Sequence, residues 1–416
     1  MTQNVLATFA IVVATVLGVL VRPFRLPEYV FALAGAGALL ALGLLPPAAA
    51  FAAVAKGYDI YLFLVGMMLL AEVARREGLF DWLAAHALHA ARGSARRLFA
   101  LVYGVGILVT VFLSNDATAV VLTPAVYAVA RAARVEPLPY LYVCAFIANA
   151  ASFVLPISNP ANLVVYGDRL PALASWIRTF AAPSLAAIGA TYLVLRWTQR
   201  RALAASLGPA PDVEPLSWEA RAAGFTLVLA ALVLVGASAL GRDLGAPTFA
   251  CGLLSTVAAS LVALRSPMPV LKHVAWGVLP LVAGLFVLVA GLEHVGAIRI
   301  VADGLSGHEH RAPAGTAFVA GLAAGLGTNL VNNLPLGLLA GAAGQAAHAP
   351  DKVMAALLIG VDLGPNLSVA GSLATLLWLI AIRREGARVD GLRFLALGAL
   401  VMPPALLLAL AALVLV

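Results

Sequence analysis

Four clusters of amide, hydroxyl and carboxylate side chains interrupt otherwise apolar stretches of this sequence. They read SNDAT at 114–118, SNPAN at 158–162, TNLVNNLP at 328–335 and DLGPNLS at 362–368. A polar group buried in apolar surroundings costs free energy unless a hydrogen bond or an ion satisfies it. The clusters are therefore the parts of the chain in which a binding site is expected.

The amide and hydroxyl groups of the clusters supply both hydrogen-bond donors and acceptors. No Lys or Arg occurs in them, which argues against an anionic substrate, although a helix N-terminus can bind an anion without a cationic side chain. The alternative for each Asn and Ser is a structural role at a break in a membrane helix. The residues expected to contact substrate are Ser114, Asn115, Asp116, Thr118, Ser158, Asn159, Asn162, Asn329, Asn332, Asn333, Asn366 and Ser368.

The acids of the clusters are Asp116 and Asp362, one in each half of the chain. Proton coupling needs a group that binds and releases a proton as its surroundings change, and a buried carboxylate is the usual one. Both acids are candidates, and Asp116 is the first choice. The alternative for Asp116 is a structural role in which neighbouring backbone amides bind its carboxylate.

The composition places these clusters in a membrane. The 416 residues are 63% hydrophobic and 11% charged, with a mean hydropathy of +1.01, and a soluble core could not bury so much apolar surface. The net charge of +7 comes from Lys and Arg in short runs between apolar segments, the pattern of the positive-inside rule rather than of a nucleic-acid-binding protein. We predict a multi-pass membrane protein that does not bind nucleic acid.

The same order of elements occurs twice along the chain. Asn115-Asp116 matches Asn332-Asn333, and in each half a hairpin with a polar tip precedes a helix broken by proline. The first repeat is 1–197, with its hairpin at about 98–130 and its broken helix at about 139–167; the linker is 198–221; the second repeat is 222–416, with its hairpin at about 314–347 and its broken helix at about 353–382. We predict an all-α membrane fold of about ten spans in a 5+5 inverted repeat, with two re-entrant hairpins and two broken helices.

The basic residues predict the orientation. Placing 22–25, 75–97, 131–134, 196–221, 265–272 and 383–393 on the cytoplasmic side collects 19 of the 26 Lys and Arg residues there. The linker is then cytoplasmic and both termini are outside. The segment 75–97 carries Trp, Leu and several charges, which is typical of a helix at the membrane interface.

Four long segments resemble the signature segments of the arsenite efflux permeases, the ArsB family of the ion transporter superfamily. They are FLSNDATAVVLTPAV, PLPYLYVCAFIANAASFVLPISNPANLVVYG, GTNLVNNLPLGLLAG and VDLGPNLSVAGSLATLLW. The resemblance implies export of arsenite and antimonite, as neutral trihydroxides, across a bacterial inner membrane in exchange for protons. It also implies a possible partner, because some members of the family associate with a soluble arsenite-stimulated ATPase.

Two other classes of function stay open at this point. The same superfamily includes sodium-coupled carboxylate transporters and sodium/proton antiporters, and the clusters also offer the oxygen atoms of a sodium site. A membrane-embedded enzyme would need a nucleophile with a base, or a metal cluster, and neither His nor Cys lies in the four clusters. We therefore expect a secondary transporter without a cofactor or a resident metal.

Overall fold

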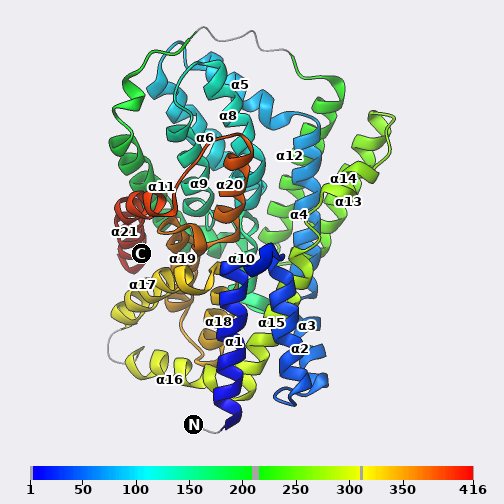
Figure 1. Cartoon of the computed structure of the whole chain (residues 1–416), viewed down its shortest axis with the longest axis vertical. Helices are drawn as coiled ribbons and strands as arrows, with labels where there is room; N and C mark the ends of the chain where they lie inside the picture. The colour runs from blue at the N-terminus through cyan, green and yellow to red at the C-terminus, as the bar shows by residue number, and fades with distance from the viewer. Residues whose placement is uncertain (1–2, 209–214, 310–312, 416) are drawn as a thin grey trace.

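The computed structural model describes residues 3–208, 215–309 and 313–415, and these residues fold into helices without a β-strand. The predicted all-α fold is confirmed. The predicted linker 198–221 is described in part, because residues 209–214 lie outside the described ranges. Figure 1 shows the helices as one assembly, with α5 at one end and α16 and the beginning of α1 at the other.

The first half of the chain contains the helices α1 to α11. They are α1 (Gln3–Val21), α2 (Glu28–Ala41), α3 (Pro47–Lys56), α4 (Tyr58–Arg76), α5 (Leu79–Ala90), α6 (Ala95–Phe112), α7 (Asn115–Ala117), the π-helix η2 (Thr118–Leu122), α8 (Thr123–Ala132), α9 (Leu138–Ala150), α10 (Pro160–Tyr166) and α11 (Leu173–Thr198). Short 3-10 turns join some of them.

The second half follows the same order. Its helices are α12 (Trp218–Ala239), α13 (Gly245–Val262), α14 (Met268–His273), α15 (Val278–His294), α16 (Ala297–Glu309), α17 (Pro313–Val331), α18 (Asn333–Ala346), α19 (Asp351–Leu363), α20 (Leu373–Arg384) and α21 (Gly391–Leu415). The 3-10 turns η6 (Gly364–Asn366) and η7 (Val369–Gly371) fill the interruption between α19 and α20.

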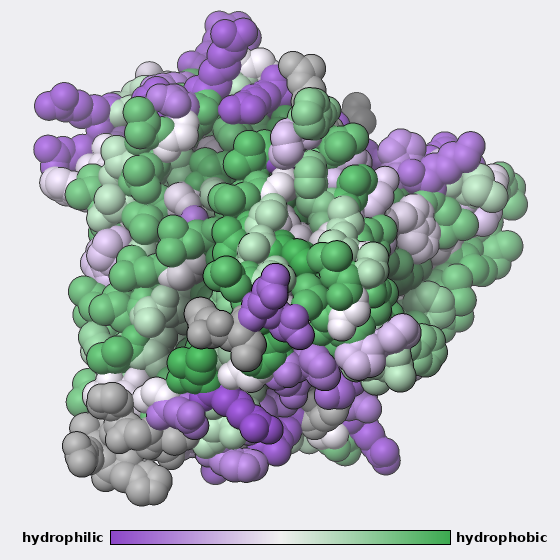
Figure 2. Space-filling model, turned by 60° about the horizontal axis from the view of Figure 1, so that its bottom comes forward, coloured by the Kyte–Doolittle hydropathy of each residue, from purple (hydrophilic) through white to green (hydrophobic). Residues whose placement is uncertain are grey.

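Seven helices of the described residues are long and apolar enough to cross a membrane: α1, α6, α11, α12, α13, α17 and α21. The bent pairs α3–α4 (46°) and α15–α16 (77°) raise this number to nine. Figure 2 shows hydrophobic residues over the middle of one face, with hydrophilic residues gathered above and below. The broken helices α9–α10 and α19–α20 are not long enough to count as spans, because each is interrupted. In contrast, α6 and α17, which were predicted as hairpin arms, are long and apolar enough to cross a membrane. The count of ten spans and the re-entrant hairpins stay predictions.

Helices of each half pack against helices of the other half. The helix α4 packs on α13 of the second half, and α15 packs on α2 of the first, while α11 and α21 pack on each other. Likewise α10 contacts α18, and α20 contacts η2 and α8. Contacts of this kind are expected between two repeats related by a two-fold axis. The inverted repeat is our interpretation of these contacts.

Close helix contacts depend on glycine at several places, among them Gly360 and Gly66. A Cβ atom added at Gly360 of α19 would lie 2.2 Å from the carbonyl oxygen of Gly321 on α17. A Cβ atom added at Gly66 of α4 would lie 2.3 Å from the carbonyl oxygen of Thr248 on α13. Small residues at helix interfaces let the backbones approach closely, and this packing stabilises helix bundles in membranes. These contacts hold the broken helix and its neighbours in place around the polar clusters.

Candidate functional site

Five helices, α7, α10, α15, α18 and α20, begin around one small central pocket. Its walls include the first residues of α7, α10, α18 and α20, with α4 and α15 closing the sides: the lining is Leu64, Asn115, Asp116, Asn159, Pro160, Val278, Asn333, Leu334, Leu373 and Ala374. The volume is about 10 Å³, room for a single water molecule. The polar clusters thus converge here from both halves of the chain, and a larger ligand needs the pocket to widen.

A larger cavity continues from the central pocket toward α14, and we call it the α14 cavity. Its volume is about 170 Å³, and it shares Leu64, Asp116, Pro160, Val278 and Leu373 with the central pocket. Its other polar side chains are Ser114, Glu72 at the end of α4, and His273 at the end of α14. Asp116 is therefore reached from this side.

The carboxylate of Asp116 is half-buried and forms no hydrogen bond with another described residue. The oxygen Oδ1 of Asn115 instead accepts a bond from the Asp116 backbone N–H, at 2.9 Å, and Ser114 Oγ accepts from the Ala117 N–H, at 3.1 Å. The turn at residues 114–117 is thus held by hydrogen bonds between neighbouring residues, which leaves the Asp116 carboxylate free for a ligand or a proton.

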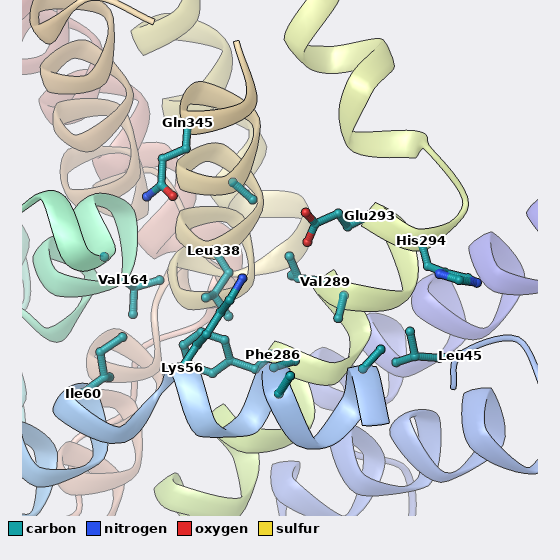
Figure 3. A pocket seen from close by; sticks show the side chains of 16 residues that line it. Leu45, Lys56, Ile60, Val164, Phe286, Val289, Glu293, His294, Leu338 and Gln345 are labelled. Carbon is teal, nitrogen blue, oxygen red and sulfur yellow. The ribbon is translucent and has the colours of Figure 1, made fainter. Parts of the chain in front are cut away.

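A third cavity, the α18 cavity, lies on the other side of the central pocket. It has a volume of about 400 Å³ between α3, α10, α15 and α18 (Figure 3). Lys56 from α3 and Glu293 from α15 both extend into it, and neither forms an ion pair with another described residue. Gln345 of α18 lines the same cavity and donates from Nε2 to the Tyr166 carbonyl of α10, at 3.2 Å.

The two broken helices are joined by reciprocal hydrogen bonds. Asn159 Nδ2, at the start of α10, donates to Asp362 Oδ1, near the end of α19, at 2.8 Å. Ser372 Oγ, at the start of α20, donates to Asn149 Oδ1, near the end of α9, at 3.4 Å. Asn159 and Ser372 also cap their own helices through the backbone N–H groups of Ala161 and Thr375. Each half therefore contributes one cap and one acceptor.

Five of the residues expected to bind substrate line the two connected cavities: Ser114, Asn115, Asp116, Asn159 and Asn333. Among them, Asn333 Oδ1 is buried without a hydrogen-bond partner among the described residues, so it is an acceptor that a ligand can satisfy. The structure brings these five together from the starts of α7, α10 and α18.

The other seven expected residues form hydrogen bonds that support the breaks, and they do not line these cavities. Asn162 Nδ2 donates to three carbonyls of residues 152–156, and Asn332 Nδ2 donates to the Ala370 carbonyl. The remaining five are Thr118 with Thr110, Ser158 with the Val111 carbonyl, Asn329 with Ser368 and the Gly364 carbonyl, and Asn366 with Asn149 and the Phe146 carbonyl. Asp362, the second candidate for proton coupling, is fully buried, and its Oδ2 has no partner among the described residues.

Three polar residues at the centre were missed in the sequence. Asn149 is fully buried and donates to Asn366 Oδ1 at 3.0 Å and to Thr375 Oγ1 at 3.3 Å, and Ser372 completes the group. A signal was present, because Asn149 precedes Asn159 by ten residues and Asp362 precedes Ser372 by ten residues. Aligning the two broken helices without a gap would have paired Asn149 with Asp362.

Comparisons with known proteins give relatives along most of the chain. The family described as CitMHS, citrate transporter, matches residues 9–360. An arsenical pump membrane protein of Yersinia enterocolitica is 27% identical over 370 residues, which cover 84% of this chain and 85% of that protein. Another, of Escherichia coli K12, is 27% identical over 377 residues with the same coverage. These relatives confirm the resemblance to the arsenite efflux permeases that the four signature segments indicated.

Two further similarities extend over more of the chain. An uncharacterized transporter of Mycobacterium tuberculosis is 25% identical over 407 residues, 94% of each protein. The crystal structure of the YdaH transporter of Alcanivorax borkumensis, described as having an unusual topology, superposes with a TM-score of 0.58 at 18% identity. The match covers 88% of this chain and 86% of that one. At 18% identity, the match shows a similarity of fold alone.

Proposed function

This chain belongs to the CitMHS family of citrate transporters and is a membrane transporter, and we propose that it exports arsenite from the cytoplasm in exchange for protons. The substrate is the neutral trihydroxide, with antimonite as a second substrate of the same shape. The protein acts in a bacterial inner membrane, where the charge bias places the α14 side in the cytoplasm and both termini outside. An ATPase subunit is a further partner that the resemblance implies.

The lining of the central pocket and the α14 cavity carries this proposal. It combines amides, a hydroxyl, the carboxylates of Asp116 and Glu72 and the imidazole of His273, and it contains neither Lys nor Arg. A trihydroxide presents both hydroxyl protons and lone pairs. Once the central pocket widens, Asp116 accepts from one hydroxyl while the amide groups of Asn115, Asn159 and Asn333 serve the others. Four heavy atoms need roughly 120 Å³ at the ~30 Å³ that a water molecule occupies in the liquid, which the α14 cavity offers.

Exchange follows from competition at Asp116. The ionised carboxylate accepts a charge-assisted hydrogen bond from a substrate hydroxyl, whereas a bound proton neutralises the carboxylate and weakens that bond. Substrate and proton therefore occupy Asp116 in turn, and each crosses while the other is absent. Because the substrate is neutral, each imported proton moves net charge, and the membrane potential contributes about 2.3 kcal/mol per charge per 100 mV.

Carboxylate transport is the second candidate, because the family description names citrate. A multiply charged carboxylate would desolvate several negative charges in this pocket, and the lining supplies no Lys or Arg to compensate them. The beginnings of α18 and α20 favour negative charge, but Asp116 beside them opposes it. The lining therefore favours a neutral substrate.

The test is uptake of arsenite into everted membrane vesicles that contain the protein and no ATPase, energised by a proton gradient. We expect uptake that collapses on addition of an uncoupler and is unaffected by citrate. Vesicles with the Asp116→Asn variant serve as the matched control. Citrate uptake, or arsenite uptake that the uncoupler leaves unchanged, would contradict the proposal.

A further inference from the structure

Two glutamates lie near the C-terminal ends of corresponding helices, one in each half of this chain. Glu72 lies near the C-terminal end of α4, and Glu293 lies near the C-terminal end of α15. After each helix the chain turns at a glycine with positive φ, Gly78 (71°) and Gly296 (78°), and a short helix follows, α5 or α16. Because α4 packs on α13 and α15 packs on α2, the two glutamates also have exchanged surroundings.

Each glutamate lines the cavity on its own side of the central pocket. Glu72 lines the α14 cavity with His273, and Glu293 lines the α18 cavity with Lys56. The α14 cavity shares lining residues with the central pocket, but the α18 cavity shares none. The two cavities are thus counterparts that approach Asp116 from opposite ends of the molecule.

A thin apolar layer separates the α18 cavity from the central pocket. On α4, Ile60 lines the cavity and Leu64 lines the pocket; on α18, the corresponding residues are Leu338 and Leu334. Each pair is four residues apart, so the layer is about one helical turn, about 6 Å, thick. All four side chains are at most 8% exposed. In this conformation Asp116 is therefore accessible through the α14 cavity and closed toward the α18 cavity.

We propose that Glu293 and Glu72 are the carboxylates through which the coupled proton exchanges between Asp116 and the two sides of the membrane. Glu293 receives the proton in the α18 cavity, on the outer side, and Glu72 releases it through the α14 cavity, on the cytoplasmic side. This inference rests on the proposed proton exchange and adds two residues to it. A buried or partly buried carboxylate in a membrane commonly belongs to such a proton path.

The charged neighbours suit these two roles. Glu72 is 7% exposed and receives two hydrogen bonds from Arg75, at 2.5 and 2.7 Å, while His273 and Asp116 face the same cavity. Glu293 is exposed to its cavity, with Lys56 across from it and His294 beside it. Lys56 lies across the α18 cavity from Glu293 (Figure 3), whereas Arg75 is hydrogen-bonded to Glu72.

The sidedness of the two cavities is tested without any substrate. In a Cys144→Ala/Cys251→Ala background, Ala290→Cys places a thiol in the α18 cavity and Ala71→Cys places one in the α14 cavity. We expect a membrane-impermeant thiol reagent to label Ala290→Cys in intact cells and Ala71→Cys in everted vesicles. Labelling of both thiols from the same side would overturn the assignment.

The roles of the glutamates are tested in proteoliposomes with a pH-sensitive dye, with the pH varied on one side at a time. We expect Glu293→Gln to make arsenite-driven proton movement independent of the outer pH and Glu72→Gln to make it independent of the inner pH. Each rate should fall about tenfold or more. Glu385→Gln, an exposed glutamate outside both cavities, is the control.

Wild-type dependence of the rate on outer and inner pH in both glutamate variants overturns the inference. A wild-type protein that moves arsenite without protons instead contradicts the proposed function, while the labelling result still stands.

Discussion

Asn159 and Asp362 join the two broken helices through a hydrogen bond of 2.8 Å, and the structure contains its counterpart with the halves exchanged, between Ser372 and Asn149. In each pair the donor is the cap of the helix that starts after the break, and the acceptor lies near the end of the helix before the other break. The two breaks therefore depend on each other. Movement of one half of the site must alter the hydrogen bonds of the other half.

Replacing Asn159 tests this dependence. Asn159→Ala removes both the bond to Asp362 and the cap of α10, so we expect a loss of stability of about 1–3 kcal/mol. Asn159→Ser should recover part of the loss, because serine is the cap at the corresponding position, Ser372. Thermal unfolding of the purified protein in detergent measures both variants. Equal melting temperatures for the alanine, serine and wild-type proteins would contradict a role for this bond.

Asp116 is the carboxylate of the central pocket that no described residue binds, and its replacement should abolish export without unfolding the protein. Asp116→Asn keeps the shape of the side chain but cannot exchange a proton, so we expect proton-coupled arsenite export to be lost while the protein stays folded in the membrane. Arsenite export from cells that produce the variant measures transport, and the melting temperature in detergent measures folding. Asp116→Glu keeps the titratable group and is the matched control. Undiminished export by Asp116→Asn removes this residue from the mechanism.

The sequence predicted the positions of the breaks but not the roles of the side chains in them. Proline marks both interruptions, and the structure has them at residues 151–159 and 364–372, within the segments of about 139–167 and 353–382 where broken helices were predicted. Within three residues, however, Asn159 lines the pocket whereas Asn162 binds the backbone of the break. This difference depends on the contact of Asn159 with Asp362 of the other half, and the spacing of residues along the sequence does not reveal that contact.

The two glutamates were overlooked for a related reason. Glu72 and Glu293 stand at the ends of apolar helices, where an acid is ordinarily solvated, and the sequence gives no sign of the cavities. These cavities form between helices that are distant in the chain, such as α3 and α18. The order of elements could be predicted because hydrophobic length and proline act locally, whereas the lining of a cavity depends on tertiary packing.

Close packing between α17 and α19 gives a prediction about stability. A methyl group at Gly360 would lie 2.2 Å from a backbone oxygen, which the helices can relieve only by moving apart. We expect Gly360→Ala to destabilise the protein by about 1–3 kcal/mol. Gly104→Ala, on α6 with open space around the added atom, should have little effect. Melting temperatures in detergent compare the two, and an unchanged value for Gly360→Ala would show that the helices are not closely packed there.

The apolar layer between the α18 cavity and the central pocket should act as a barrier to protons. Leu338 is part of this layer, and Leu338→Ala removes most of a side chain that is 6% exposed. Because the layer is about one helical turn thick, water can then reach Asp116 from both cavities at once. We expect a proton leak in proteoliposomes without arsenite, at least several-fold above wild type, measured with an internal pH dye after a potassium-valinomycin potential is applied. Leu339→Ala, the neighbouring position outside the cavity lining, should leave the membrane tight. If Leu338→Ala also leaves the membrane tight to protons, the barrier lies elsewhere, because removing the Leu338 side chain then opens no path for water to Asp116.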